Sequence, residues 1–302
     1  MTNGFINVYK PPGITSMEVV RQIKKPLGNV KTGHCGTLDP LAEGVLPIAI
    51  GKASRIVEYV LHESKTYKAK IKLGESTTTY DAEGTITAHA PTSGLTRSLI
   101  EQILPQYTGN IQQVPPIYSA LKKAGRPLYE YARKGDLIEI EPRWVYIHNI
   151  DLLTFNEPFV ELRITCGAGT YIRSLADDLG RSLGCGAHMV GLIREQSSGF
   201  KLKDSVKLNT IHDAISSNPK AISQYLQPID SPIAYMPKLG ISSNNELNIL
   251  HGKTIQAHTP NLSDPSMIPL HRAYNPSGTF LAIMSHDYSS GNWKPVKVFN
   301  SL

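Results

Sequence analysis

The sequence predicts an α+β fold in two parts, and three observations support this prediction. Residues 65–73 alternate between polar and apolar side chains, as a half-buried β-strand does. Residues 160–166 alternate in the same way, and residues 170–183 then carry apolar side chains at helical spacing. From Gln227 onward, prolines mark a linker and short strand-like runs follow it. We therefore expect one part over residues 1–228 and a smaller β-rich part over residues 229–302.

The first elements follow from local patterns. Residues 5–9 read as a short strand, and Thr15 or Ser16 is expected to cap the helix after it. An apolar strand over residues 45–50 and a helical stretch over residues 53–61 come next.

The strand over residues 65–73 should place Tyr67 inward or on the floor of a cleft. Its lysines would then face solvent or phosphate on the other side. An ordinary core aromatic and a solvated strand face are the plainer alternatives. The lysines are Lys68, Lys70 and Lys72.

The middle of the chain combines a helix over residues 95–104 with a basic, aromatic-rich segment within residues 107–143. Such mixtures suit base stacking and phosphate binding, although an exposed loop and helix with ordinary surface charges would look the same. Thr170 is expected to cap the helix that ends at Gly184. The strands expected in the second part lie at 254–256, 267–273, 279–284 and 294–299.

Composition narrows the class of protein. Lys and Arg number 31 against 25 Asp and Glu, and the net charge of +6 favours a polyanionic partner, although many soluble basic proteins share it. The 3 scattered cysteines argue against a disulfide framework. The N-terminus does not resemble a signal peptide, and no apolar run is long enough to span a bilayer. We expect a cytoplasmic protein.

Asp39 is the most informative single residue. It is the only aspartate in a run of mostly small, apolar and turn-forming residues between Gly33 and Pro47. An N-cap role is favoured locally, because Pro40 suits a first helical position and Gly44 would end a short helix. The helix dipole opposes a cation in a first turn, so Arg173 should have an anionic partner, unless it simply extends into solvent.

Metal and nucleotide sites are not favoured. The pairs Cys185 with His188 and His34 with Cys35 do not have the spacing of a zinc finger. The segment 167–169 lacks the third glycine of a dinucleotide-binding loop. No P-loop and no nucleophile elbow is present.

Several segments together resemble the TruB-type tRNA pseudouridine synthases. The resemblance covers about the first three-quarters of the chain, and the C-terminal part is more weakly similar to a PUA domain, a small RNA-binding β-barrel. Departures are small, with Cys35 where the family often has Thr and Tyr118 where Phe is commoner. The segments are KPPGITS at 10–16, GHCGTLDP at 33–40, KTY at 65–67, PPIYSALK at 115–122, RPLY at 126–129, GTYIRSL at 169–175, and GCGAH at 184–188 with Leu192.

The resemblance implies a pseudouridine synthase core with a mixed, largely antiparallel sheet flanked by helices, an RNA-contacting insertion at about 107–143, and a PUA-like barrel. The implied activity is isomerisation of uridine to pseudouridine at position 55 in the T-loop of tRNA, after the base has been flipped out. The implied partner is the tRNA T-arm stem-loop, with no cofactor, no metal, no membrane and no obligatory protein partner. We expect a monomer.

The resemblance also assigns roles to residues. Asp39 would be the nucleophile, attacking either the ribose or the base, and Arg173 would pair with it and keep its pKa low. Tyr67 would stack on the flipped base, with a further role in removing the carbon-5 proton left open. The implied substrate-binding residues are His34, which would hold or displace the loop, Tyr171 and Leu192, which would line the pocket, and Lys10.

Two alternatives remain at this stage. The first is a guide-RNA-dependent relative, which typically has a longer extension before the Lys-Pro motif than the nine residues that precede Lys10 here. The second is a non-catalytic factor that helps tRNA fold. The combination of Asp39, Tyr67 and Arg173 favours an enzyme.

Overall fold

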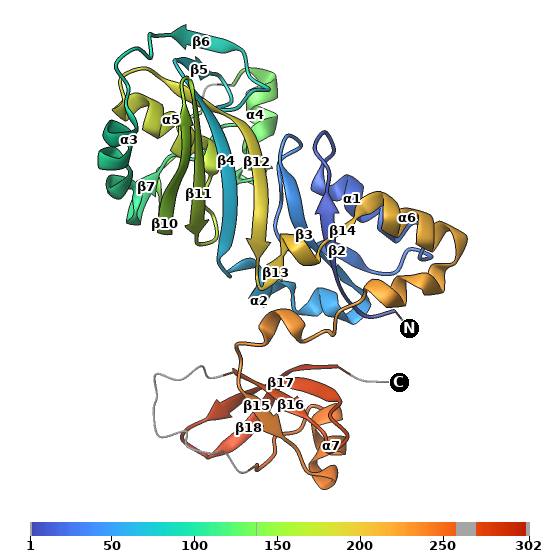
Figure 1. Cartoon of the computed structure of the whole chain (residues 1–302). Helices are drawn as coiled ribbons and strands as arrows, with labels where there is room; N and C mark the ends of the chain where they lie inside the picture. Colours follow the sequence, from blue (N-terminus) through green and yellow to red (C-terminus); the bar gives the residue numbers. More distant parts are fainter. Residues whose placement is uncertain (1, 137, 258–269, 300–302) are drawn as a thin grey trace.

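The computed structural model describes residues 2–136, 138–257 and 270–299. Its main body is a ten-stranded sheet in the order β14-β1-β3-β12-β4-β11-β10-β7, with β2 beside β3 and β13 beside β12 (Figure 1). The strands are β1 (Gly4–Lys10), β2 (Thr32–His34), β3 (Glu43–Ile50), β4 (Lys65–Leu73), β7 (Gly109–Gln113), β10 (Arg143–Asn156), β11 (Phe159–Cys166), β12 (Ala187–Ser197), β13 (Phe200–Lys201) and β14 (Val206–Lys207).

The sheet is mixed and largely antiparallel, as expected. Parallel pairing joins β1 to β14 and β3 to β12, and the other neighbours run antiparallel. Two short hairpins stand apart from the sheet: β5 (Glu75–Thr77) with β6 (Ile86–His89), and β8 (Lys122–Lys123) with β9 (Arg126–Pro127). The α-helices are α1 (Ser16–Lys24), α2 (Val57–Leu61), α3 (Arg97–Ile103), α4 (Leu128–Lys134), α5 (Ile172–Ser182), α6 (Leu208–Ser217) and α7 (Ser243–Leu250).

The half of the sheet around β1 and β3 is covered on both faces. Ile6 and Val8 of β1 belong to the main core, which also contains the apolar faces of α1 and α6. Phe5 points the other way, into a second cluster that includes Val60 of α2. Strands buried on both faces read as continuous apolar runs, which explains why residues 45–50 do not alternate.

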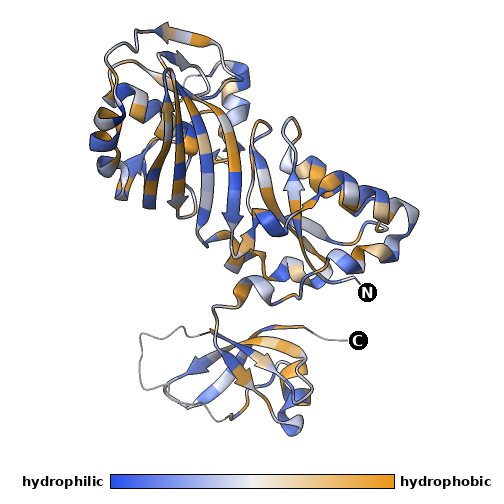
Figure 2. Cartoon of the chain, in the orientation of Figure 1, coloured by the Kyte–Doolittle hydropathy of each residue, from blue (hydrophilic) through white to orange (hydrophobic). Residues whose placement is uncertain are grey.

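The other half of the sheet is covered on one face. Along β4 the burial pattern alternates, so Tyr67, Ala69, Ile71 and Leu73 are buried as predicted. Figure 2 shows this alternation of hydrophilic and hydrophobic residues along β4. The buried face packs on α5, whose Leu175 and Leu179 belong to the same core.

Two long strands were not predicted from the sequence. β12 and β10 each contain two register shifts against a neighbour, at Met189/Gly191 and Arg194/Gln196 in β12 and at Ile147/Asn149 and Leu152/Thr154 in β10. A bulge inserts an extra residue, and this breaks the period of two on which strand prediction depends.

The C-terminal part forms a four-stranded sheet in the order β15-β16-β17-β18, beside α7 (Figure 1). In the described residues β15 and β18 do not pair with each other, so no closed barrel is seen there. The expected strand at 254–256 is reduced to a bridge between Ile255 and Trp293, and residues 267–269 lie outside the described residues. The strands are β15 (Lys238–Gly240), β16 (Leu270–Tyr274), β17 (Phe280–Asp287) and β18 (Asn292–Val298).

The two parts share a hydrophobic cluster. Ile283 and Phe299 of the C-terminal part pack in it together with Ala53 and Ile56, which lie just before α2. Lys297 forms an ion pair with Glu58 of α2. The C-terminal part is therefore attached to the segment that leads into β4, rather than joined by the linker alone.

None of the helices in the described residues has both the length and the apolar character needed to cross a bilayer.

Candidate functional site

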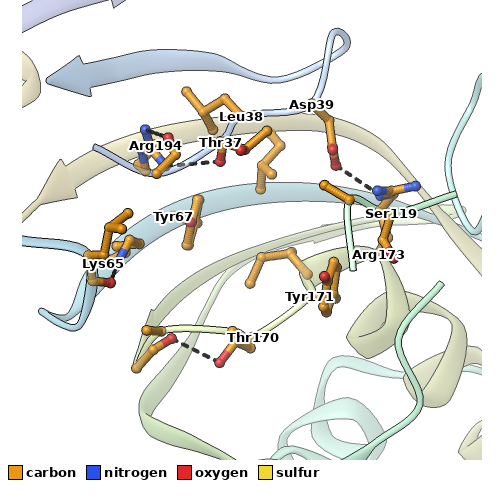
Figure 3. Close-up of a pocket in the computed structure, with 18 residues that line it drawn as sticks. Thr37, Leu38, Asp39, Lys65, Tyr67, Ser119, Thr170, Tyr171, Arg173 and Arg194 are labelled. Atoms are coloured by element: carbon orange, nitrogen blue, oxygen red, sulfur yellow. Dashed lines mark hydrogen bonds and ion pairs between the residues drawn. The ribbon is translucent and has the colours of Figure 1, made fainter. Parts of the chain in front are cut away.

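A pocket of about 260 Å³ opens between the loop before β3 and the start of α5 (Figure 3). Five of the seven predicted site residues line it: Asp39, Tyr67, Tyr171, Arg173 and Leu192. The volume is close to the lower end of the range for small-molecule sites, about 300 Å³, and leaves room for a single planar base.

The loop that carries Asp39 connects β2 to β3, and no helix begins at Asp39. The N-cap alternative is therefore wrong for this residue. The loop is anchored by the N-terminal motif: Ser16 Oγ accepts from the Leu38 N–H at 2.8 Å and donates to the Leu38 carbonyl at 3.0 Å. The Gly13 N–H donates to the Pro40 carbonyl at 2.8 Å. Thr15, rather than Ser16, caps α1.

Lys10 has a different position from the one expected of a substrate-binding residue. Its side chain is fully buried, and it is not part of the pocket lining. The ammonium donates to the carbonyls of Pro11, Pro40 and Ala42 at 2.9, 3.1 and 2.6 Å, which uses all three of its hydrogens. Burial lowers the pKa of Lys10 to about 8. In this structure Lys10 therefore supports the Asp39 loop, and its predicted role in binding substrate stays a prediction.

Arg173 has the anionic partner that the helix-dipole argument required. It lies in the first turn of α5, is only 5% exposed, and its Nε is 2.9 Å from Asp39 Oδ2. A second carboxylate, Asp81 Oδ2, lies 3.3 Å from Nη1 of the same guanidinium. Nη2 donates to the Tyr118 carbonyl at 3.0 Å, so the insertion also contacts this arginine. Asp81 was not predicted from the sequence, because it lies in a polar turn with no local signal.

The pKa of Asp39 differs in direction from the prediction. Burial raises it, Arg173 lowers it, and the like charge of Asp81 raises it again, so that the net shift is upward. The guanidinium is shared between two carboxylates and therefore does not fully offset the loss of water. The Asp39 side chain nonetheless keeps 34% of its surface exposed in the pocket, where a substrate could reach it.

The aromatic residues lie on the opposite side of the pocket from the Asp39 loop (Figure 3). Tyr67 is 7% exposed on β4, and burial raises the pKa of its phenol. Tyr171, rather than Thr170, is the residue that precedes α5 as its N-cap. Gln113 of β7 fixes it from both sides, accepting from the Tyr171 N–H at 2.8 Å and donating to the Tyr171 carbonyl at 3.0 Å.

His34 lies on β2, outside the pocket lining. Its Nδ1 is buried and has no hydrogen-bond partner within the described residues. Burial, aided by the positive charge of Arg194, lowers the pKa of His34, so the ring is neutral at neutral pH. The predicted role in holding or displacing an RNA loop stays a prediction.

Two cations in the pocket were missed by the sequence reasoning. Lys65 donates to the carbonyls of Leu61 and Glu63 at 3.0 and 2.8 Å, and burial lowers its pKa to about 8. Arg194 is fully buried and lines the pocket beside Leu192. Leu192 and Arg194 lie two residues apart in continuous register with β4, but the bulges on either side of them break the alternation by which β12 could have been recognised.

The three lysines on the outer face of β4 are not a free phosphate-binding surface. Lys68 pairs with Glu161 at 3.0 Å, Lys72 pairs with Glu75 at 2.6 Å, and Lys70 lies over the Phe159 ring. The plainer alternative, a strand face with ordinary surface charges, describes them better. In the insertion, by contrast, Lys122, Lys123 and Arg126 are exposed.

The fold and the pocket together define the pseudouridine synthase class. A family model described as the N-terminal domain of TruB family pseudouridylate synthase matches residues 24–172, and one described as the tRNA pseudouridylate synthase B C-terminal domain matches residues 173–234. The chain belongs to the TruB family.

Individual relatives support the assignment to the TruB family. Proteins named tRNA pseudouridine synthase B are 39% identical in Dehalococcoides mccartyi, over 98% of this chain and 96% of the relative, and 41% identical in Pseudomonas aeruginosa, over 84% of both. A solved chain from an H/ACA RNP bound to a substrate RNA containing 2'-deoxyuridine has a TM-score of 0.74 and 26% identity, covering 98% of this chain and 85% of that chain. A chain of a Cbf5-Nop10-Gar1 complex has a TM-score of 0.73 and 28% identity, covering 98% of this chain and 84% of that chain.

Proposed function

We propose that the protein isomerises uridine to pseudouridine in tRNA, at position 55 of the T-loop. The observation that carries this proposal is the Asp39 carboxylate, exposed in a base-sized pocket and paired with a buried Arg173. The names of the relatives support tRNA as the substrate. The T-loop and position 55 come from the resemblance of the motifs.

The reaction rearranges one nucleotide without adding or removing atoms. The target base is flipped out of the tRNA fold into the pocket. Asp39 acts as the nucleophile and forms a bond to the nucleotide, the C1′–N1 bond breaks and the base turns. A C1′–C5 bond then forms, and the bond to Asp39 breaks so that the carboxylate is released. The proton at carbon-5 is then lost and N1 gains one. Arg173 fixes the Asp39 carboxylate, Tyr67 stacks on the base, and Tyr171 and Leu192 complete the walls of the pocket.

The two remaining predicted site residues, His34 and Lys10, are proposed to act on loops: one of the tRNA and one of the protein. We propose that His34 helps to hold or displace the T-loop, while Lys10 acts indirectly, through its hydrogen bonds to the Asp39 loop. No cofactor or metal is required, because the isomerisation involves no net oxidation and no added group.

We further propose that residues 1–228 are the catalytic domain, with the RNA-contacting insertion at about 107–143, and that residues 229–302 are a PUA-like RNA-binding domain. The short strands β15–β18 and the exposed basic residues of the insertion support this division. The partner would be the tRNA T-arm, bound by a cytoplasmic monomer without an obligatory protein partner.

The test is release of tritium from an unmodified tRNA transcript labelled at uridine carbon-5. We expect release with the wild type and none with Asp39→Asn, which should still bind tRNA with nearly unchanged affinity because the amide has the same shape. Asp213→Asn is the matched control, since Asp213 is 82% exposed on α6. Equal turnover by Asp39→Asn would refute the nucleophile assignment.

The same assay separates a second candidate function. The likeness to solved chains from an H/ACA RNP and from a Cbf5-Nop10-Gar1 complex favours a guide-RNA-dependent enzyme as the alternative. Bare transcript without guide or added protein should be modified if the enzyme acts alone. Tight binding without tritium release from the wild type would instead indicate guide dependence or a tRNA-folding factor.

A further inference from the structure

Arg194 is a buried charge to which the proposed function assigns no role. Its guanidinium lies under the surface of the pocket and donates to three backbone carbonyls (Figure 3). Nε contacts the Val45 carbonyl at 2.7 Å, Nη1 contacts Thr37 at 3.3 Å, and Nη2 contacts Gly36 at 3.1 Å. The three acceptors lie on both sides of Asp39 in the chain, so one side chain fixes the position of both limbs of the catalytic loop.

The charge of Arg194 is not neutralised by a carboxylate. Arg173 pairs with two aspartates, whereas no ion pair of Arg194 is found in the part of the chain that the structure describes. Burying an unpaired charge costs several kcal/mol, and carbonyl dipoles only partly offset this cost. A protein that keeps such a charge next to a pocket has a local positive field there that a neutral hydrogen-bond donor would not create.

The register of the sheet places this charge next to Tyr67. Arg194 of β12 lies directly opposite Tyr67 of β4, and side chains in such cross-strand pairs lie on the same face and in contact range. Burial raises the pKa of Tyr67, and both the charge of Arg194 and a hydrogen bond from it oppose that rise. The guanidinium therefore lies beside Tyr67, on whose ring the flipped base is proposed to stack.

The proposed reaction produces negative charge on that side of the pocket. When the C1′–N1 bond breaks, its electron pair remains on the base and spreads over N1, O2 and O4. The charge disappears when the C1′–C5 bond has formed, carbon-5 has lost its proton and N1 has gained one. Preorganised positive charge near such a transient anion is a large source of catalysis.

We propose that Arg194 is a positioning residue of this isomerisation, which fixes both limbs of the Asp39 loop and, from its place beside Tyr67 in the pocket wall, stabilises the negative charge on the detached base. The inference rests on the proposed function. It differs from a purely structural role in one measurable respect: the loss of Arg194 should matter less for a base that carries negative charge more easily.

The experiment compares two substrates in single-turnover reactions, a tRNA with uridine at the target position and one with 4-thiouridine there. Sulfur in place of O4 spreads negative charge better and leaves carbon-5 free to react. Arg194→Gln keeps hydrogen-bond donors but removes the charge, and we expect it to slow the uridine reaction about 100-fold. On 4-thiouridine the deficit relative to wild type should shrink to about tenfold. tRNA affinity should stay within about threefold of wild type.

Arg163→Gln is the matched control, because Arg163 lies on the outer face of the sheet and pairs with Glu195. It should react like wild type with both substrates. Equal deficits of Arg194→Gln on uridine and 4-thiouridine would overturn the inference, because a misplaced loop slows both reactions alike. Unchanged rates would overturn it as well.

Arg194→Lys keeps the charge, and it replaces Arg194→Gln in the experiment if the glutamine variant does not fold. We expect it to retain about a tenth of the wild-type rate, with the same deficit on both substrates. A rate as low as a hundredth, or a deficit that shrinks on 4-thiouridine, would overturn the inference. Wild-type protein that makes no pseudouridine would instead refute the proposed function, so that the two failures are distinguishable.

Discussion

Two carboxylates share one guanidinium at the centre of the site. Asp39 is partly exposed and Asp81 is buried, and both contact Arg173. Because burial and Asp81 raise the pKa of Asp39, the carboxylate loses its charge at a higher pH than an ordinary aspartate does. A protonated carboxylic acid is a poor nucleophile, so turnover should fall as the pH falls through this raised pKa.

Asp81→Asn should move the acid limb of the pH–rate profile to lower pH. The substitution removes a negative charge that raises the pKa of Asp39, and it leaves more of the Arg173 charge to lower it. The measurement is kcat against pH under saturating tRNA. Glu101→Gln, at an exposed position paired with Arg97, serves as the control and should leave the limb in place. An acid limb that stays in place or moves upward in Asp81→Asn would contradict the assignment.

The sequence could predict Asp39 and Arg173 as site residues, but not the other charged residues around them. Asp39 stands alone in an informative motif, and Arg173 is placed in a first helical turn by the spacing of apolar residues. Asp81 reaches Arg173, and Arg194 reaches the pocket, only through the pairing of distant segments, for which a single sequence has no local signal. The upward shift of the Asp39 pKa was missed for the same reason, since it depends on burial in the folded protein and on Asp81.

At the scale of elements, β12 is the strand that organises the site. It pairs with β3 on one side and β4 on the other, and so joins the Asp39 loop to the strand that carries Tyr67. The predicted strands were mostly those with clean alternation or continuous apolar runs. β12 and β10 were missed because bulges break their pattern, and the bulges of β12 lie beside the residues that line the pocket.

Gly44→Ala should test how closely β3 and β12 must approach. Gly44 has φ +102°, and a Cβ there would lie 2.5 Å from the Arg194 carbonyl oxygen. Gly94 has a similar φ of +93° but open space around it, so Gly94→Ala measures the backbone strain alone. We expect the free energy of unfolding to fall by about 2 kcal/mol or more beyond the control. Urea denaturation gives the free energy of unfolding of both variants. Equal losses in Gly44→Ala and Gly94→Ala would show that β3 and β12 can move apart without a cost in stability.

The molecule as a whole combines a modest positive charge with a local concentration of exposed basic residues in the insertion. Replacing Lys122, Lys123 and Arg126 with glutamine should weaken tRNA binding, because each phosphate contact releases counterions. The slope of log K against log salt should become less steep by about 2 units. The measurement is tRNA affinity at a series of salt concentrations.

A triple glutamine variant elsewhere on the surface separates a local effect from a change in net charge. Lys203, Lys207 and Lys220 are exposed and lie far along the chain from the insertion. Replacing them changes the net charge by the same amount. If both triple variants flatten the salt dependence equally, the insertion is not a specific RNA-contacting surface.

The position of β12 in the sheet has a consequence for synthesis of the chain. β3 and β4 are made early, yet the strand that lies between them spans residues 187–197. Until those residues leave the ribosome, two long strands have unpaired edges, which are templates for aggregation. The pairing also joins segments far apart in the chain, which slows folding. The enzyme should therefore depend on rapid completion, or on chaperones, more than a protein whose central strands are neighbours in sequence.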